Sequence, residues 1–153
     1  MLKAIIVYES RYGNTKLVAE KIAEGMNEVS GGGAVSAELK KVDLSQIAEY
    51  DVILVGSPNN MGMATRGIRK FIDNLGKLKL EGKKAAVFDT YQGGDFEKAA
   101  KKMEVQLRKK APGLKWVIPC LSIRVKRMRG PIADGELPKC KEFGAKIATV
   151  LKG

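Results

Sequence analysis

The chain contains no histidine, only two cysteines and a single tryptophan among its 153 residues. Cys120 and Cys140 lie far apart, form no Cys-x-x-Cys pair and have no histidine with which to share a metal ion. We therefore expect two free thiols, no disulfide framework and no metal site.

Long apolar runs are also missing. No segment approaches the roughly 20 residues that a membrane-spanning helix needs, and Met1-Leu2-Lys3 leads into a strand-like segment without the layout of a signal peptide. We expect a cytoplasmic protein with no membrane association. At 44% hydrophobic residues, the chain can bury one core but is too short for two ordinary domains, so residues 1–153 should form a single domain.

Acidic residues are scarce in one part of the chain. The formal charge is +11, from 28 Lys and Arg against 17 Asp and Glu. Residues 1–100 hold 14 basic and 13 acidic residues and residues 130–153 hold 4 and 3, whereas residues 101–129 hold 10 basic residues and only Glu104. No reading helix, aromatic platform or known module accompanies this local charge, so we do not expect nucleic-acid binding.

Strand-like and helical segments alternate through the rest of the sequence. Such alternation with short loops predicts right-handed βαβ crossovers, hence a doubly wound α/β fold with a five-stranded parallel sheet in the order 2-1-3-4-5 and helices on both faces. Pro119 cannot donate to a sheet ladder, which suits an edge strand. In chain order, the expected strands are 2–8, 34–42 (the other edge), 51–57, 84–90 and 114–125, and the expected apolar helix stripes begin at Val18, Ile68, Phe96 and about Leu137.

Three loops should meet where strands one, three and four end, beside the point at which the strand order reverses. They are residues 9–15, 57–64 and 90–95. The first enters a helix, whose free N–H donors and positive dipole end suit a phosphate group. An ordinary helix capped by Asn14 or Thr15 is the alternative. The Walker A and G-x-G-x-x-G spacings are absent, and a receiver domain would need an aspartate at the end of strand three, where Gly56-Ser57-Pro58 stands.

The segment Ser-Arg-Tyr-Gly-Asn-Thr (10–15), directly after the first strand, resembles the FMN phosphate loop of the flavodoxin family. The segment GSPNNMG (56–62) is similar to the second flavin loop of that family, and DTYQGGD (89–95) to the third. The C-terminal RGPIADGELPKCKEFGAKIA resembles the tail of small stand-alone flavodoxin-domain proteins of prokaryotes. The likeness covers essentially the whole chain and implies a flavodoxin-like fold, an FMN cofactor and electron transfer.

The resemblance also implies roles for individual residues, none of them catalytic. It assigns phosphate binding to the first loop, where Arg11 and Tyr12 act mainly through backbone N–H groups, and it assigns one side of the flavin to the second loop and the other side to the third. These cofactor-binding residues are Ser10, Arg11, Tyr12, Gly13, Asn14 and Thr15, then Ser57, Pro58, Asn59, Asn60, Met61 and Gly62, and finally Thr90, Tyr91, Gln92, Gly93 and Gly94.

The second loop departs from the family pattern. Flavodoxins often stack an aromatic side chain from this loop on the flavin, whereas the present sequence offers only Met61. Tyr91 is then the candidate for stacking, unless it simply faces solvent, and Trp116 is expected in the core. In the family, a small residue at the position of Gly62 lets a peptide flip, so that a carbonyl accepts a hydrogen bond from N5–H of the one-electron-reduced flavin.

The sequence leaves three functions open. An FMN-binding electron carrier is the leading one, although the sequence does not distinguish FMN from a deazaflavin. An FMN-dependent NAD(P)H:quinone oxidoreductase is the second, but no second dinucleotide site is evident. A flavin-free adaptor that kept the fold is the third, and the missing aromatic is the main argument for it.

The basic segment suggests a redox partner. The lysines and arginines of the fourth helix fit a solvated face, but RVKRMRG (124–130) leaves the fifth strand on the same rim as the flavin loops. We expect Lys126, Arg127 and Arg129 to guide an acidic partner protein or an anionic substrate to the flavin edge.

Overall fold

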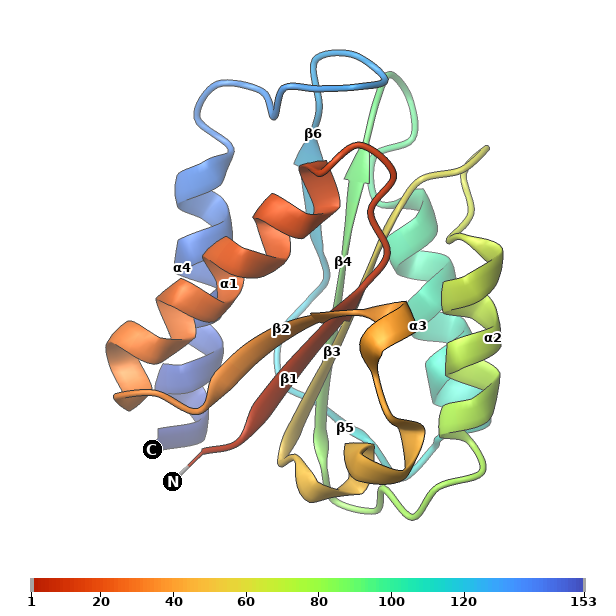
Figure 1. Cartoon of the computed structure of the whole chain (residues 1–153), viewed down its shortest axis with the longest axis vertical. Helices are drawn as coiled ribbons and strands as arrows, with labels where there is room; N and C mark the ends of the chain where they lie inside the picture. Colours follow the sequence, from red (N-terminus) through yellow and green to blue (C-terminus); the bar gives the residue numbers. More distant parts are fainter. Residues whose placement is uncertain (1, 153) are drawn as a thin grey trace.

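A central parallel sheet carries four helices, two on each face, in a computed structural model that describes residues 2–152 (Figure 1). Met1 and Gly153, the ends of the expected domain 1–153, lie outside the described residues. The strand order is β2-β1-β3-β4-β5, which confirms the predicted order, and a further strand, β6, pairs with β4. The strands are β1 (Ala4–Tyr8), β2 (Ala34–Glu38), β3 (Val52–Pro58), β4 (Lys84–Tyr91), β5 (Lys115–Trp116) and β6 (Leu121–Arg124).

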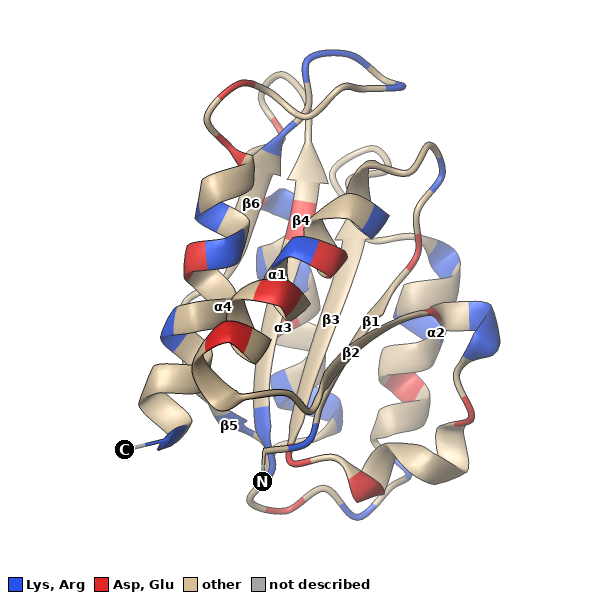
Figure 2. Cartoon of the chain, turned by 60° about the vertical axis from the view of Figure 1, so that its left-hand side comes forward, with Lys and Arg blue, Asp and Glu red and all other residues tan. Residues whose placement is uncertain are grey.

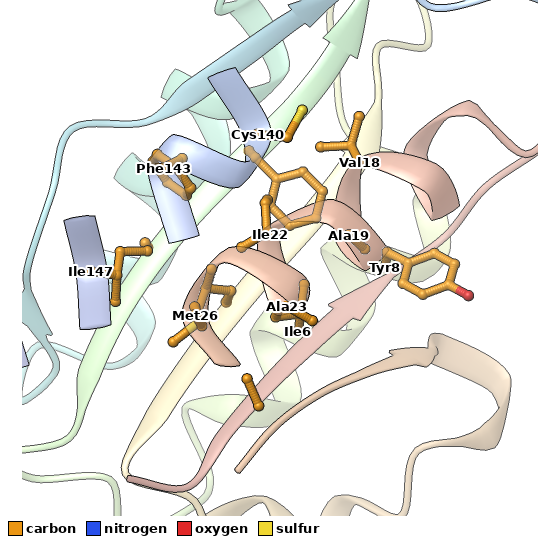
Figure 3. Close-up of a cluster of buried hydrophobic side chains, with 14 of the residues drawn as sticks. Ile6, Tyr8, Val18, Ala19, Ile22, Ala23, Met26, Cys140, Phe143 and Ile147 are labelled. Atoms are coloured by element: carbon orange, nitrogen blue, oxygen red, sulfur yellow. The ribbon is translucent and has the colours of Figure 1, made fainter. Parts of the chain in front are cut away.

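The sheet divides the core into two apolar clusters, one on each of its faces. Side chains that alternate along a strand enter opposite clusters, so that Ile6 lies in one and Val7 in the other. Figure 3 shows the first cluster, where Ile22 and Phe143 lie between helices and sheet. Helices α1 (Asn14–Ser30) and α4 (Leu137–Lys152) cover this face, and α2 (Arg66–Leu75) and α3 (Lys98–Lys110) cover the other (Figure 1).

The expected fifth strand, 114–125, is not continuous. It is divided into β5 and β6, both parallel to β4, and Pro119 lies in the gap between them. Because proline has no N–H, the ladder has no donor at this position. Trp116 is only partly buried, and the Arg108 guanidinium lies 4.7 Å from the centroid of its ring. The expectation of a core tryptophan is therefore met only in part.

Two other predicted segments were longer than the elements that the structure contains. The edge strand expected over 34–42 ends at Glu38, and Leu39–Lys41 form a short 3-10 helix. The stripe expected to start at Phe96 is wrong at its first residue, which is 55% exposed, because Glu97 has a positive φ of 61° and α3 begins only at Lys98. The later positions of that stripe are buried as predicted.

Helices α1 and α4 approach each other backbone to backbone. A Cβ added to Gly144 would lie 2.0 Å from the carbonyl oxygen of Ile22, and one added to Gly25 would lie 2.0 Å from that of Lys141. Only glycine allows this separation. The contact fixes the position of α1, whose first turn carries the loop after β1.

A buried carboxylate joins three elements beneath the loops at the carboxyl ends of the strands. Asp89 is fully buried at the end of β4, and its Oδ2 accepts hydrogen bonds from Asn59 Nδ2 and from the N–H of Ala100, both at 2.9 Å. The Ser122 hydroxyl donates to Oδ1. Burial raises the pKa of this carboxyl above its ordinary value in spite of these donors. Asp89 therefore links the loop after β3 to α3 and β6.

The helix contact makes one prediction about stability. Gly144→Ala should lower the free energy of unfolding by about 2 kcal/mol, because the added methyl group overpacks the contact between α1 and α4. In an exposed helix interior, the same substitution would instead raise the free energy of unfolding by up to about 1 kcal/mol. Urea unfolding followed by circular dichroism measures the change. Thr149→Ala, on an exposed face of α4, is the control; a Gly144→Ala variant as stable as that control would contradict the close approach.

The buried carboxylate makes a second prediction. In Asp89→Asn, the amide oxygen can accept from Asn59 and Ala100 while its NH₂ donates to the Ser122 hydroxyl, so we expect the fold to persist. Because the folded-state pKa of Asp89 is raised, the wild type should lose stability relative to the variant as pH rises from about 3.8 through that raised pKa. Urea unfolding at several pH values measures this difference. A wild type that gains stability relative to the variant over the same range would contradict it.

Candidate functional site

A cavity of about 720 Å³ opens at the carboxyl ends of the central strands. It lies where the order of the sheet reverses, which is the usual position of a ligand in a doubly wound fold. All three predicted loops contribute to its wall. The predicted residues that line it are Ser10, Arg11, Tyr12, Asn14, Thr15, Pro58, Asn59, Asn60, Met61, Thr90, Tyr91 and Gln92.

The first loop leaves an open helix N-terminus beside this cavity. Gly13, with φ of 93°, precedes α1, and no side chain caps the helix, so the alternative in which Asn14 or Thr15 is the cap is wrong. Within residues 2–152, nothing accepts a hydrogen bond from the N–H groups of Asn14, Thr15 and Lys16. The N–H of Gly13 donates to Ser10 Oγ at 3.0 Å, which folds the loop back and leaves the Ser10 hydroxyl proton free to donate.

A pair of hydroxyl groups connects the first loop to the third. Thr15 Oγ1 and Thr90 Oγ1 lie 2.9 Å apart, and the two residues are only 1% and 4% exposed. Both side chains also line the cavity. One hydroxyl donates to the other, and the proton left over can be donated into the cavity.

The second loop is a tight turn that projects one methionine. Asn60 and Met63 exchange backbone hydrogen bonds at 2.7 and 3.1 Å around Met61 and Gly62, whose φ angles are 55° and 77°. Met61 is 94% exposed at the mouth of the cavity. Ser57 lies behind the wall: it is fully buried, accepts from the N–H of Thr65 and donates to the carbonyl of Pro58, so it shapes the loop.

The third loop is anchored from two sides. Tyr91 lines the cavity, and its ring meets Phe96 edge to face with centroids 5.3 Å apart. Asn59 accepts from the N–H of Ala99 and donates from its own N–H to the carbonyl of Thr90, each at 2.9 Å. The remaining predicted residues, Gly13, Gly62, Gly93 and Gly94, are not part of the cavity wall and belong to the turns around it.

The cavity also includes residues that the sequence did not indicate. Glu9 accepts a hydrogen bond from the hydroxyl of Thr65, which in turn accepts from the N–H of Ile68 and caps α2. Glu9 and Asp95 are the end residues of the predicted loops 9–15 and 90–95, although no role was assigned to them; this position was the available signal, and Thr65 carried no pattern. The unpredicted lining residues are Glu9, Glu38, Thr65, Arg66, Gly67, Asp95, Val125 and Met128.

The donor set suits an anionic head group attached to a flat body. Unpaired backbone N–H groups and hydroxyls at the start of α1 are the groups that bind phosphate in proteins. Away from that end, the wall includes Met61, Tyr91 and Val125, which offer apolar and aromatic surface. A phosphorylated flavin therefore fits the chemistry of this cavity. Among residues 2–152, no helix is long and apolar enough to cross a membrane.

Comparisons with known proteins agree with this geometry. The family model described as Flavodoxin matches residues 6–127. A flavodoxin of Aquifex aeolicus is 36% identical over 99 aligned residues, with 61% of this chain covered; the chain spans about half the length of that relative, with 52% covered.

Solved structures extend the similarity to the whole chain. A flavodoxin from the domain Archaea has a TM-score of 0.85 and 31% identity, with 99% of this chain and 100% of that chain covered. Oxidised flavodoxin 2 of Bacillus cereus has a TM-score of 0.82 and 27% identity, with 96% and 98% covered. With the family model matched over most of its length, the chain belongs to the flavodoxin family.

Proposed function

We propose that the protein binds FMN and carries electrons between redox partners. The observation that supports this most is the uncapped start of α1, where three N–H groups that find no acceptor among residues 2–152 adjoin a cavity enclosed by three loops. The phosphate would be held by the N–H groups of Asn14 and Thr15 and by the hydroxyls of Ser10 and Thr15. Arg11 and Tyr12 would complete the phosphate site through their backbone N–H groups, and Gly13, whose own N–H is bonded to Ser10 Oγ, would shape the turn into α1.

The other two loops would hold the flavin ring. One side is assigned to Ser57 through Gly62, where Ser57 acts from behind the wall, and the other to Thr90 through Gly94. Tyr91 is the aromatic side chain offered for stacking. FMN supplies the redox chemistry, because it exchanges one or two electrons, and the protein supplies binding, orientation and electrostatic tuning.

The two alternatives have less support. An adaptor without flavin would have no need for an open cavity with unpaired N–H donors at one end. An NAD(P)H:quinone oxidoreductase would need room for a dinucleotide beside the flavin, and a further cavity, to whose wall none of the three loops contributes, measures only about 120 Å³. Electron transfer to a separate partner is therefore preferred.

The proposed partner carries negative charge. Figure 2 shows basic residues on the loop between β6 and α4, above the sheet. Lys126 lies 3.3 Å from Asp134 and is partly neutralised, whereas Arg127 is exposed and forms no ion pair within residues 2–152. The exposed methionines Met61 and Met128 stand at the same cavity mouth. An acidic protein or a small anion would be attracted to this edge.

FMN binding is the first prediction of this proposal. The purified protein, titrated with FMN, should quench its fluorescence and give a bound-flavin absorption spectrum. Thr15→Val should weaken binding about tenfold, because a hydrogen bond to a charged group contributes about 1.5–3 kcal/mol and 1.4 kcal/mol is a factor of ten. Thr149→Val, on the exposed face of α4, is the control. Absence of any FMN binding by the wild type would overturn the proposal.

Attraction of anions to the basic loop between β6 and α4 is the second prediction. Photoreduced FMN-loaded protein should be oxidised by ferricyanide faster at about 20 mM salt than at about 0.5 M, because salt screens the basic loop. Lys126→Gln combined with Arg127→Gln should slow the low-salt rate by about threefold or more and leave the high-salt rate unchanged. Oxidation by the cationic oxidant hexaammineruthenium(III) should not be slower in the double variant than in the wild type. Equal salt dependence in the wild type and the double variant would contradict a docking role for these residues.

A further inference from the structure

The segment between β6 and α4 forms a short hairpin, here called the β6–α4 hairpin (Val125–Ile132). Val125 and Ile132 form an antiparallel bridge, and the N–H of Lys126 donates to the carbonyl of Pro131 at 2.9 Å. The N–H of Gly130 donates to the carbonyl of Arg127, which closes the turn at the tip. The hairpin is therefore an ordered element and is joined to the third loop, since the N–H of Val125 donates to the carbonyl of Tyr91 at 2.9 Å.

The tip of this hairpin lies against the first loop. A Cβ added to Gly130, whose φ is +108°, would lie only 2.7 Å from Asn14 Oδ1. The guanidinium of Arg129 lies 5.7 Å from the centroid of the Tyr12 ring, and that of Arg11 lies 5.6 Å from the same centroid. The hairpin thus contacts the loop at Asn14 and at Tyr12, two of the residues assigned to phosphate binding.

The hairpin also forms part of the cavity wall. Val125 and Met128 line the cavity together with the first loop, and Met128 is 67% exposed at its mouth. None of the sequence patterns assigned these residues to a flavin site; the segment suggested only attraction of a partner. Its position makes it a further element around the cavity, beyond the three loops that resemble the family motif.

Two guanidinium groups beside an open helix N-terminus favour an anion. Arg11 and Arg129 form no ion pair with any carboxylate of residues 2–152, so their charges are not neutralised by a bonded partner. Three carboxylates that line the cavity, Glu9, Glu38 and Asp95, oppose this attraction in part. However, Glu9 is bonded to Thr65 at the start of α2, and Asp95 is paired with Lys98 at 3.3 Å. The positive charges of the two arginines therefore lie together at Tyr12. They are beside the N–H groups of the first turn of α1, which find no acceptor within residues 2–152.

We propose that the β6–α4 hairpin is a further element of the cofactor site and that Arg129, held with Arg11 at Tyr12, selects the phosphorylated flavin over the unphosphorylated one. This inference rests on the proposed FMN binding. Arg129 acts at the phosphate end by charge, and Gly130 acts by letting the hairpin contact Asn14. The hairpin then slows release of the cofactor, since it closes the cavity beside the first loop.

A charge substitution tests the selectivity. Arg129→Gln should raise the dissociation constant for FMN about fivefold at low salt, and the difference should disappear near 1 M salt, where the Debye length falls to about 3 Å. The dissociation constant for riboflavin, which lacks the phosphate, should not change. Arg124→Gln removes the same charge at the exposed end of β6, from a residue that does not lie over Tyr12, and is the control. An equal loss of affinity for FMN and riboflavin, or no loss for FMN, would overturn the role of Arg129.

A pair of glycine substitutions tests the contact of the hairpin. Gly130→Ala should raise the dissociation rate of FMN about tenfold, because its Cβ would push the hairpin away from Asn14. Gly135→Ala also places alanine at a positive φ, of +81°, in the same β6–α4 connection, but nothing lies within 4 Å of its Cβ. It should leave the rate unchanged. Thermal unfolding of both variants without FMN corrects for strain common to the two substitutions.

The outcomes separate the two proposals. Wild-type protein that binds FMN while Gly130→Ala and Gly135→Ala release it at the same rate would overturn only the hairpin inference. Wild-type protein that binds neither FMN nor riboflavin would overturn the proposed function, and the inference with it. Faster release from Gly130→Ala alone, together with phosphate-dependent loss in Arg129→Gln, is the expected result.

Discussion

The unpaired N–H groups at the first turn of α1 are the constraint on which the site depends. Backbone donors without acceptors are stable only where water or a ligand can reach them, so this end of the helix must face an open cavity. Gly13 turns the chain into the helix without supplying a side-chain cap. The close contact of α1 with α4 at Gly144 then holds that first turn in a fixed position relative to the sheet.

Buried polar groups assemble the other loops around this helix end. The hydroxyl pair of Thr15 and Thr90 joins the first loop to the third, and Asp89 holds Asn59 of the second loop against the start of α3. Such bonds are costly to break because each group is removed from water. A cavity built in this way is largely formed before any ligand enters, which lowers the ordering cost of binding.

The basic segment separates into parts with different surroundings. Arg108 lies over Trp116 on the outer strand, Lys126 is paired with Asp134, and Arg129 lies over Tyr12 beside the cavity. The charge that looked like a single patch in the sequence therefore includes a contact with Trp116, an ion pair and a group that lies over Tyr12, a residue of the cavity wall. Net charge alone could not have made this distinction, because each role depends on the nearest neighbour in space.

The sequence by itself determined the parallel sheet, its strand order and the three loops, because continuous apolar strands, helix periodicity and the Ser-x-x-Gly-Asn-Thr motif are all local patterns. It could not show that the fifth strand is divided at Pro119, that Asp89 joins three elements, or that Val125 and Met128 line the cavity. Those features depend on contacts between residues distant in the chain, and only the packed tertiary structure brings their side chains together.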